Sequence, residues 1–201
     1  MVILPKKKDI FSMTNKLIKE NLKIIVKKLP VVNIHFYQGI LSITVPMNRL
    51  VSTLSILKNH INFQFKVLSC ISGVDYPNKK RRFKIVYELL SLKYNTRLRV
   101  KVFVDELTPI KSSISVYPAA GWYESEIWDM FGVFFVDHSN LTRLLTDYGF
   151  EGYPLRKDFP LSGFIETSYD YNKKQVLNSK IELSQEYKSF NFKSSWEDLK
   201  L

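Results

Sequence analysis

Residues 122–160 read WYESEIWDMFGVFFVDHSNLTRLLTDYGFEGYPLRKDFP, and within this stretch the regular patterning of the chain ends. The part from Gly121 to Phe131 can form a short helix, because Gly132 is a typical C-terminal cap. From about Thr146 onward, helical and strand periodicities fade, and aromatic residues alternate with charges, Gly and Pro. We therefore predict a short helix followed by a long extended C-terminal tail.

The preceding 120 residues show a regular succession of helical and strand patterns. Apolar residues three or four positions apart mark helices, and apolar runs bounded by Gly, Pro or Asn mark strands. The predicted elements are a helix between Ser12 and Pro30, strands Val31–Phe36 and Ile40–Val45, a helix from Leu50 to about Asn59, and strands Phe65–Ile71, Phe83–Leu92 and Leu98–Val104. This order of helix, two strands, helix and three strands predicts an α+β fold, a two-layer domain in which helices cover one face of a mainly antiparallel sheet.

The charge of the chain is distributed unevenly. The 201 residues carry 30 Lys and Arg and 19 Asp and Glu, which gives a formal net charge of +11. Residues 1–120 have a net charge of +15, whereas residues 121–201 have a net charge of −4 and hold 17 of the 28 aromatic residues. An aromatic-rich composition without basic excess is typical of protein interfaces. We place a boundary near residue 120.

Several kinds of chemistry have no basis in this sequence. The single cysteine, Cys70, forbids an intramolecular disulfide and any multi-thiolate zinc or iron–sulfur site within this chain. No apolar run approaches the roughly 20 residues of a membrane span. The chain contains no phosphate-binding glycine loop, HExxH or GxSxG motif. The start of the chain lacks the features of secretory and transit peptides. If the protein works in an organelle, we therefore expect it to be synthesised in that organelle.

Two glutamates, Glu124 and Glu126, superficially indicate acid–base catalysis. Residues two apart on a helix point in different directions, so these carboxylates do not converge on one substrate atom. We expect them instead to pair with Arg143, Arg156 or Lys157, where the tail folds back or a partner docks.

The basic half of the chain raises the alternative of a basic RNA-binding or ribosomal protein. Its densest patch, Lys79-Lys80-Arg81-Arg82, lies in a predicted turn, where charges are usually solvated. The aromatic residues that would stack on bases lie in the acidic half. The segment Gly149-Phe150-Glu151-Gly152 matches a GXXG loop, but Glu151 would repel a phosphate backbone. A stand-alone hydrolase using Glu124 or Glu126 is a third possibility.

The stretch over 122–160 closely resembles the signature of the thirty-kilodalton subunit family of respiratory complex I, the proton-pumping NADH:ubiquinone oxidoreductase. The matching phrases are Glu124-x-Glu126 followed by Trp128-Asp129-Met130-Phe131-Gly132, then His138 and Arg143, then Leu145-Thr146-Asp147-Tyr148-Gly149-Phe150-Glu151-Gly152, and then Pro154-Leu155-Arg156-Lys157-Asp158-Phe159-Pro160. A weaker resemblance continues as far as Trp196. The chain departs from the usual family pattern at Ser125, Ser139 and Ser168.

The resemblance implies a non-catalytic core subunit of the peripheral arm, in the quinone module, without an active site of its own. It implies that FMN, the iron–sulfur clusters and ubiquinone are bound by partner subunits. The implied neighbours are the large hydrogenase-like subunit of the quinone cavity and the small subunit with the terminal cluster, with other peripheral-arm and accessory subunits nearby. The implied location is the matrix side of the mitochondrial inner membrane, or the cytoplasmic face in bacteria, without a direct membrane span or nucleic acid.

The resemblance also divides the chain and assigns interface residues. We expect a basic α+β domain over 1–120, a family signature segment with short helices and a Gly/Pro-rich loop over 121–160, and an extended subunit-binding tail over 161–201. The residues expected at subunit interfaces are Glu124, Glu126, Trp128, Asp129, Arg143, Asp147, Tyr148, Gly149, Phe150, Gly152, Pro154, Arg156, Lys157, Asp158, Phe159 and Trp196. Catalytic, cofactor-binding and metal-binding residues are expected to be absent from this chain.

Overall fold

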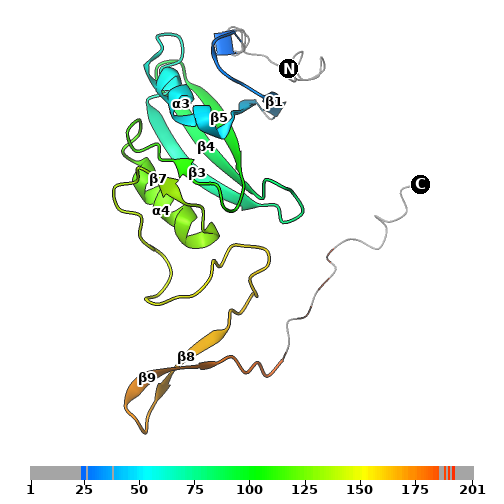
Figure 1. The fold of residues 1–201 in the computed structure, drawn as a ribbon, viewed down its shortest axis with the longest axis vertical. Coiled ribbons are helices and arrows are strands. Elements are labelled where there is room, and N and C mark those ends of the chain that lie inside the picture. The colour runs from blue at the N-terminus through cyan, green and yellow to red at the C-terminus, as the bar shows by residue number, and fades with distance from the viewer. Residues whose placement is uncertain are drawn as a thin grey trace, which may run out of the picture. The chain divides into compact units, whose positions relative to one another are not determined.

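The computed structural model describes residues 24–25, 27–37, 39–185, 188, 190 and 192 of the chain. Its helices and strands follow one another along these residues as drawn in Figure 1. The elements are β1 (Asn33–Tyr37), β2 (Ile40–Thr44), the 3-10 helix η1 (Met47–Arg49), α3 (Leu50–Asn59), β3 (Val67–Asp75), β4 (Phe83–Ser91), β5 (Thr96–Val104), β6 (Ile110–Lys111), α4 (Ala120–Phe131), β7 (Phe135–Val136), β8 (Ile165–Asp170) and β9 (Gln175–Lys180).

The main structure is a five-stranded mixed sheet with the order β1-β2-β5-β4-β3. The pairs β1–β2, β4–β5 and β3–β4 are antiparallel, whereas β2 and β5 run parallel. Strand β3 carries a bulge between Leu68 and Cys70. Because β5 lies in the middle of the sheet, it joins the β1–β2 hairpin to the β3–β4 pair.

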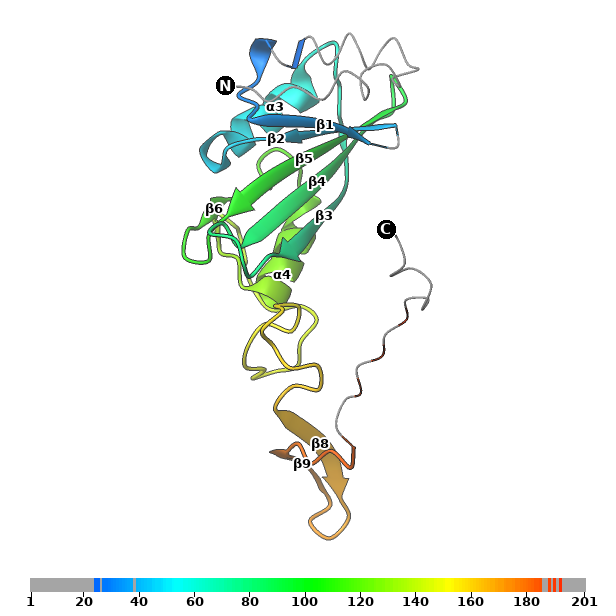
Figure 2. The same ribbon diagram turned by 90° about the vertical axis from the view of Figure 1, so that its right-hand side faces the viewer.

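One face of the sheet carries the hydrophobic core. Alternate residues of the two central strands are buried, namely Phe83, Ile85, Tyr87 and Leu89 of β4 and Leu98, Val100, Val102 and Val104 of β5. Helix α3 adds Leu50, Leu54 and Leu57, and helix α4 adds Ile127 and Phe131 to the same cluster. In Figure 2, the strands β3, β4 and β5 lie in front of α4. The period of two along the strands therefore separates a core face from a second face without these helices.

The α+β fold class is confirmed, but the predicted order of elements was incomplete. The sheet contains one parallel pair, and a second small sheet pairs β6 with β7 in parallel. The tail was wrongly predicted to lack strands, since β8 and β9 form an antiparallel hairpin. The helix predicted between Ser12 and Pro30 falls mostly outside the described residues. Its described residues 24, 25, 27 and 28 are helical.

The chain divides into two compact units, residues 1–159 and residues 160–201. The first unit contains the five-stranded sheet, α3 and α4. The second contains the β8–β9 hairpin, in whose turn Asp170 accepts hydrogen bonds from the backbone N–H groups of Asn172 and Lys173. Nearly every residue of this hairpin is exposed, so the hairpin has almost no core of its own. The division at residue 120, which rests on charge and composition, stays a prediction.

Helix α4 ends at Gly132, as its sequence predicts. Gly132 adopts the left-handed conformation with φ of 73°, and its N–H donates to the carbonyl oxygen of Trp128 at 2.9 Å. A Cβ atom at Gly132 would lie 2.6 Å from the ring of Tyr153 and 2.7 Å from the guanidinium of Arg156. Glycine is therefore required both for the backbone conformation and for the close approach of the later loop.

Replacing Gly132 by Ala is expected to lower the free energy of unfolding by about 2–4 kcal/mol. The left-handed backbone contributes about 1–2 kcal/mol of this loss, and displacement of Tyr153 and Arg156 contributes the rest. Urea denaturation of the full chain measures the change. The matched control is Gly39→Ala, because Gly39 has φ of 79° but no atom within 4 Å of an added Cβ. Equal losses in the two variants would contradict the requirement for close approach.

Candidate functional site

The carboxylate of Asp129 binds the start of the signature loop. Asp129 lies on α4 and its side chain is fully buried. Its Oδ2 atom accepts hydrogen bonds from the consecutive N–H groups of Leu144, Leu145 and Thr146 at 3.2, 2.7 and 2.9 Å. Its Oδ1 atom accepts from Thr146 Oγ1 at 2.6 Å and from the Arg143 guanidinium at 3.1 Å. One side chain therefore fixes four consecutive residues of the loop.

These hydrogen bonds keep Asp129 ionised. Burial by itself raises the pKa of the carboxyl group, because it penalises the charged form. The hydrogen bonds from the Thr146 side chain and from three backbone N–H groups outweigh that effect, and the net pKa lies below its usual value. The stable form of Asp129 in the folded chain is therefore the carboxylate, which accepts hydrogen bonds only.

The second buried carboxylate, Glu124, has a different partner set from the predicted one. Glu124 was expected to pair with arginine or lysine of the later loop. Its carboxylate instead accepts hydrogen bonds from Ser112 Oγ at 2.6 Å, and from the backbone N–H and Oγ of Ser113 at 2.8 and 2.7 Å. His138 Nε2 lies 4.0 Å from Glu124 and 3.1 Å from the carbonyl oxygen of Gly121. Glu124 thus connects α4 to the segment before it. The prediction that Glu124 pairs with Arg143, Arg156 or Lys157 was wrong.

The end of the signature loop is held by a second ionic cluster. Arg82 forms a bidentate pair with the buried carboxylate of Asp75, at 2.8 and 2.9 Å, and its NH2 also lies 2.9 Å from Asp158. Asp75 in turn accepts a hydrogen bond from the backbone N–H of Lys157 at 2.8 Å. The hydrogen bonds from Arg82 hold the pKa of Asp75 below its usual range despite burial. The last residue of β3 and the residue before β4 therefore bind residues 157–158 directly.

Arg156 adds a third attachment beside this cluster. Its Nε donates to the carbonyl oxygen of Phe131 at 2.7 Å, and its NH1 pairs with Glu106. The guanidinium lies 5.2 Å from the ring centre of Phe83 and 4.5 Å from that of Tyr153, which are cation–π distances. Arg156 therefore binds the loop to the end of α4 and to the core, all within the first unit.

Aromatic contacts complete the fixation of the loop. Trp128 packs edge-on against Phe134 and Tyr153, with ring centroids 5.9 Å apart in both pairs. The rings of Phe150 and Phe159 are also 5.9 Å apart. A Cβ atom at Gly152 would lie 2.8 Å from the Phe159 ring, so glycine allows this contact. These contacts lie within the chain, so the aromatic signature residues named here stabilise its own loop.

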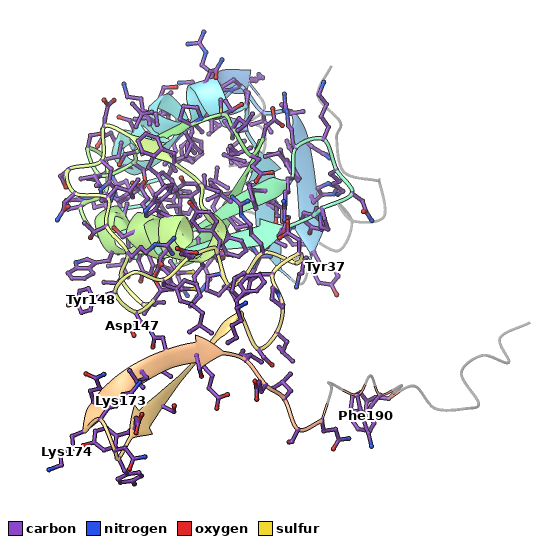
Figure 3. The ribbon with its side chains drawn as sticks, turned by 60° about the horizontal axis from the view of Figure 1, so that its bottom comes forward. Tyr37, Asp147, Tyr148, Lys173, Lys174 and Phe190 are labelled. Atoms are coloured by element: carbon purple, nitrogen blue, oxygen red, sulfur yellow. The ribbon has the colours of Figure 1, made fainter. Side chains whose placement is uncertain are left out.

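Other side chains of the same loop are exposed. Tyr148 is fully exposed at 103%, and Leu145 is 62% exposed. Leu144 and Leu155 are exposed to a smaller degree. Figure 3 shows Tyr148 and Asp147 pointing away from the sheet-bearing unit. We call Leu144, Leu145, Tyr148 and Leu155 the apolar loop surface. Such a group of exposed apolar side chains on a fixed loop is a candidate protein-docking site.

The remaining predicted interface residues fall into three groups. Glu126 is exposed on α4, and Gly149 and Pro154 lie in the fixed loop. The Asp147 carboxylate accepts a hydrogen bond from the N–H of Tyr148 at 2.8 Å. Trp196 lies outside the described residues. The contacts of the described residues with other subunits stay predictions.

Sequence reasoning missed the partners that hold the signature loop. The missed residues are Asp75, Arg82, Glu106, Ser112 and Ser113. Ser112 and Ser113 lie shortly before the signature, whereas Asp75, Arg82 and Glu106 lie farther from it. Arg82 belongs to the basic run that was expected to be solvated, and the other four residues belong to no motif. The available signal was indirect, since Asp75 follows an apolar strand run by a few residues and is one of six acidic residues in the basic half.

The described residues show no grouping that fits a metal ion. Within them, no three or more His, Cys, Asp or Glu side chains come together as a ligand set. Cys70 lies half-buried on β3, where burial raises the pKa of its thiol. No helix in the described part of the chain is long and apolar enough to cross a membrane.

Comparison with known proteins identifies the family of this fold and signature. The model of the family described as "Respiratory-chain NADH dehydrogenase, 30 Kd subunit" matches residues 43–165. The chain belongs to this family. It is 53% identical over 166 residues to NADH-ubiquinone oxidoreductase subunit 9 of Reclinomonas americana, covering 83% of this chain and 81% of the relative. It is 56% identical over 144 residues to NADH dehydrogenase (ubiquinone) iron-sulfur protein 3 of Arabidopsis thaliana, covering 72% and 76% of the two chains.

A solved structure shares the fold of this 30 kDa family member. A chain in the structure of the membrane-bound sulfane sulfur reductase, an archaeal respiratory membrane complex, aligns with a TM-score of 0.64 and 27% identity. The alignment covers 84% of this chain and 98% of that chain. The family resemblance predicted from the signature is confirmed, and the chain is a subunit of NADH:ubiquinone oxidoreductase, respiratory complex I.

Replacing Asp129 by Asn is expected to lower the free energy of unfolding by about 3 kcal/mol at neutral pH, because a buried amide cannot accept the same set of hydrogen bonds. The folded pKa of Asp129 lies below the unfolded one, so its contribution is present above about pH 4 and is lost as the pH falls through the unfolded and then the folded pKa. The difference between wild type and variant should therefore shrink in acid. Urea denaturation over a pH series measures it, and a difference independent of pH would contradict this account.

Proposed function

We propose that this chain is a non-catalytic core subunit of the peripheral arm of complex I, in the quinone module. It supports assembly and NADH-to-ubiquinone electron transfer without an active site of its own. Its proposed neighbours are the large hydrogenase-like subunit of the quinone cavity and the small subunit with the terminal cluster. The observation that carries the proposal is the fully exposed Tyr148 on a loop fixed by Asp129.

The fixed loop favours docking because its ordering occurs during folding of the chain itself. Holding a residue in one backbone conformation costs about 1–2 kcal/mol, and a loop that is already held does not incur this cost on binding. An exposed tyrosine that enters a partner pocket contributes about 2–4 kcal/mol when it is a hot spot. The apolar loop surface therefore resembles a preorganised anchor rather than a flexible segment.

The second unit supports an extended docking role for the tail. A single two-stranded hairpin is at best marginally stable in water. The β8–β9 hairpin nevertheless exposes Ile165, Tyr169, Tyr171 and Val176. We propose that neighbouring subunits cover these apolar side chains. We also propose that the chain has three parts, namely the basic domain over 1–120, the signature segment over 121–160 and the subunit-binding tail over 161–201.

The donor set of this chain does not fit an iron–sulfur cluster of its own. The Arabidopsis relative is named an iron-sulfur protein. A biological cluster needs about four ligands, of which at least two are thiolates even in the centres that use histidine, and this chain supplies one cysteine, whose thiol pKa is raised by burial. We propose that FMN, the clusters and ubiquinone are bound by other subunits, and that no electron-transfer step passes through a group held here.

The archaeal structure gives independent support for a structural role. That complex is a sulfane sulfur reductase, whereas the relatives of higher identity are named for NADH and ubiquinone. A fold that occurs in respiratory complexes with different named reactions fits a role in assembly better than a role in substrate chemistry. We further propose that the complex lies at the mitochondrial inner membrane with this subunit on the matrix side, and that the gene is organellar.

Replacing Tyr148 by Ala is expected to reduce the amount of assembled complex at least about fivefold, because an exposed hot-spot side chain is lost. The isolated chain should keep its unfolding midpoint within error, since Tyr148 has no core contact. Native gel separation with in-gel NADH oxidation measures the assembled complex, and quinone reduction is normalised to it.

The control is Tyr37→Ala, which removes a 69% exposed tyrosine of β1 outside the signature. Tyr37 and Tyr148 are both labelled in Figure 3. The control should assemble normally. A Tyr148 variant that assembles at wild-type level but reduces quinone slowly would overturn the assembly role.

Replacing Arg156 or Phe159 by Ala is expected to reduce assembly more than activity per assembled complex. Arg156 differs from Tyr148 because its guanidinium donates hydrogen bonds to the Phe131 carbonyl oxygen and to the Glu106 carboxylate. Its removal should therefore also lower the free energy of unfolding, by about 2–3 kcal/mol. Thermal and urea unfolding of the chain, measured beside the native gel, separate the two effects. An Arg156 variant with unchanged stability and reduced assembly would assign its guanidinium to a partner instead.

A further inference from the structure

The face of the sheet opposite the core is basic and carries no described helix. Register places Lys84, Val86 and Glu88 of β4 beside Phe103, Lys101 and Arg99 of β5 on this face. The helices α3 and α4 pack on the other face, with the core. We call Lys84, Arg97, Arg99 and Lys101, together with Lys79 from the β3–β4 turn, the basic face.

The cations of the basic face outnumber their described partners. Arg99 pairs with Glu88 across the two strands. Lys84 donates a hydrogen bond to the Tyr76 hydroxyl at 2.6 Å, and no carboxylate of the described residues forms an ion pair with it. Lys101 is half-buried, and no described carboxylate forms an ion pair with it. Burial lowers the pKa of Lys101, the charges of Lys84 and Arg99 lower it further, and the Glu88 carboxylate offsets this lowering only in part. This arrangement is unfavourable in the chain alone.

We propose that the basic face is a second docking surface, separate from the apolar loop surface, and that it binds an acidic segment of another polypeptide of the complex through aspartate and glutamate carboxylates. A carboxylate placed between Lys84 and Lys101 would relieve the repulsion between them. This occupant also gives a role to the basic half of the chain, which the signature segment does not explain.

The composition of the face favours a polypeptide over a nucleic acid. The ring of Tyr76 is already covered by Lys79 at 4.4 Å and Lys84 at 4.8 Å, so it is not open for stacking with a base. The half-buried Leu90 of β4 lies beside Arg97 on the same face, so an apolar side chain accompanies the charges, as in a protein interface.

Charge complementarity also argues against the N-terminal segment of this chain as the occupant. Residues 1–23 contain six lysines and two acidic residues, which is the wrong sign of charge. Residues 160–201 contain six acidic and six basic residues, so the C-terminal part of the chain has no net negative charge either. The basic face therefore needs an acidic partner from elsewhere in the complex.

Carbodiimide treatment of the purified complex tests the contact directly, because this reagent joins a lysine amine to a carboxylate in contact with it. Mass spectrometry should find peptides with Lys84 or Lys101 joined to Asp or Glu of another polypeptide. Lys93, which is exposed in the β4–β5 turn, serves as the internal control. Cross-links of Lys84 and Lys101 only within this chain, or reactivity with an amine label equal to that of Lys93, would overturn the proposal.

Replacing the lysines by neutral residues tests the charge repulsion on the basic face. The substitutions should make the isolated chain more stable and the assembled complex less resistant to salt. In the double variant Lys84→Gln and Lys101→Gln, loss of charge repulsion should raise the unfolding midpoint of the full chain by about 2 °C. The same variant should leave roughly tenfold less intact complex after a wash in high salt. Lys93→Gln should change neither value.

Each contrary result has a clear meaning. A double variant whose complex survives salt like wild type would show that the basic face binds no acidic partner. Label protection that disappears after ribonuclease or phospholipase treatment would assign the face to RNA or to an anionic lipid, and would also refute the proposal. The assembly defect of the Tyr148 variant is measured without a salt wash, so failure here leaves the role of the apolar loop surface unaffected.

Discussion

The fixed signature loop depends above all on one buried carboxylate. Asp129 accepts hydrogen bonds from three consecutive backbone N–H groups, from a threonine hydroxyl and from the Arg143 guanidinium. A buried charge is tolerated only when it is fully hydrogen-bonded, and here the bonds come from a segment that has no regular secondary structure. The loop therefore has one favoured path, and the ionic cluster of Asp75 and Arg82 fixes its other end.

This arrangement changes the meaning of the signature residues. Buried and half-buried members such as Asp129, Trp128 and Arg156 contact their own chain, whereas Tyr148 contacts solvent. Residues of the first kind determine the shape of the loop, and those of the second kind are available to a partner. A segment that resembles an interface in sequence thus contains two groups with different physical roles, which truncation of side chains can separate.

Local features of the fold were predictable from the sequence, and distant pairings were not. Gly132 marks the end of α4 because capping depends on neighbouring residues, and the alternation along β4 and β5 reveals a sheet with one buried face. The parallel pairing of β2 with β5 leaves no local pattern. The partner of Glu124 was predicted wrongly because Ser112 and Ser113, twelve and eleven residues earlier, donate the hydrogen bonds that were expected from arginine or lysine. The β8–β9 hairpin had a signal in Asp170 and Asn172, which form its turn, but its exposed strands lack a hydrophobic pattern.

The parallel pair of β2 and β5 has a consequence for the newly made chain. Ile43 of β2 lies opposite Val100 of β5, so this contact closes a loop of more than fifty residues. Contacts of such long sequence separation form late and slowly, whereas the β3–β4 and β4–β5 pairs are nearly local. During synthesis, the β1–β2 hairpin leaves the ribosome before β5, so β2 has no parallel partner strand until β5 has also emerged. In that interval its apolar strands are exposed to aggregation, and a chaperone that shields them would determine how much subunit reaches the assembling enzyme.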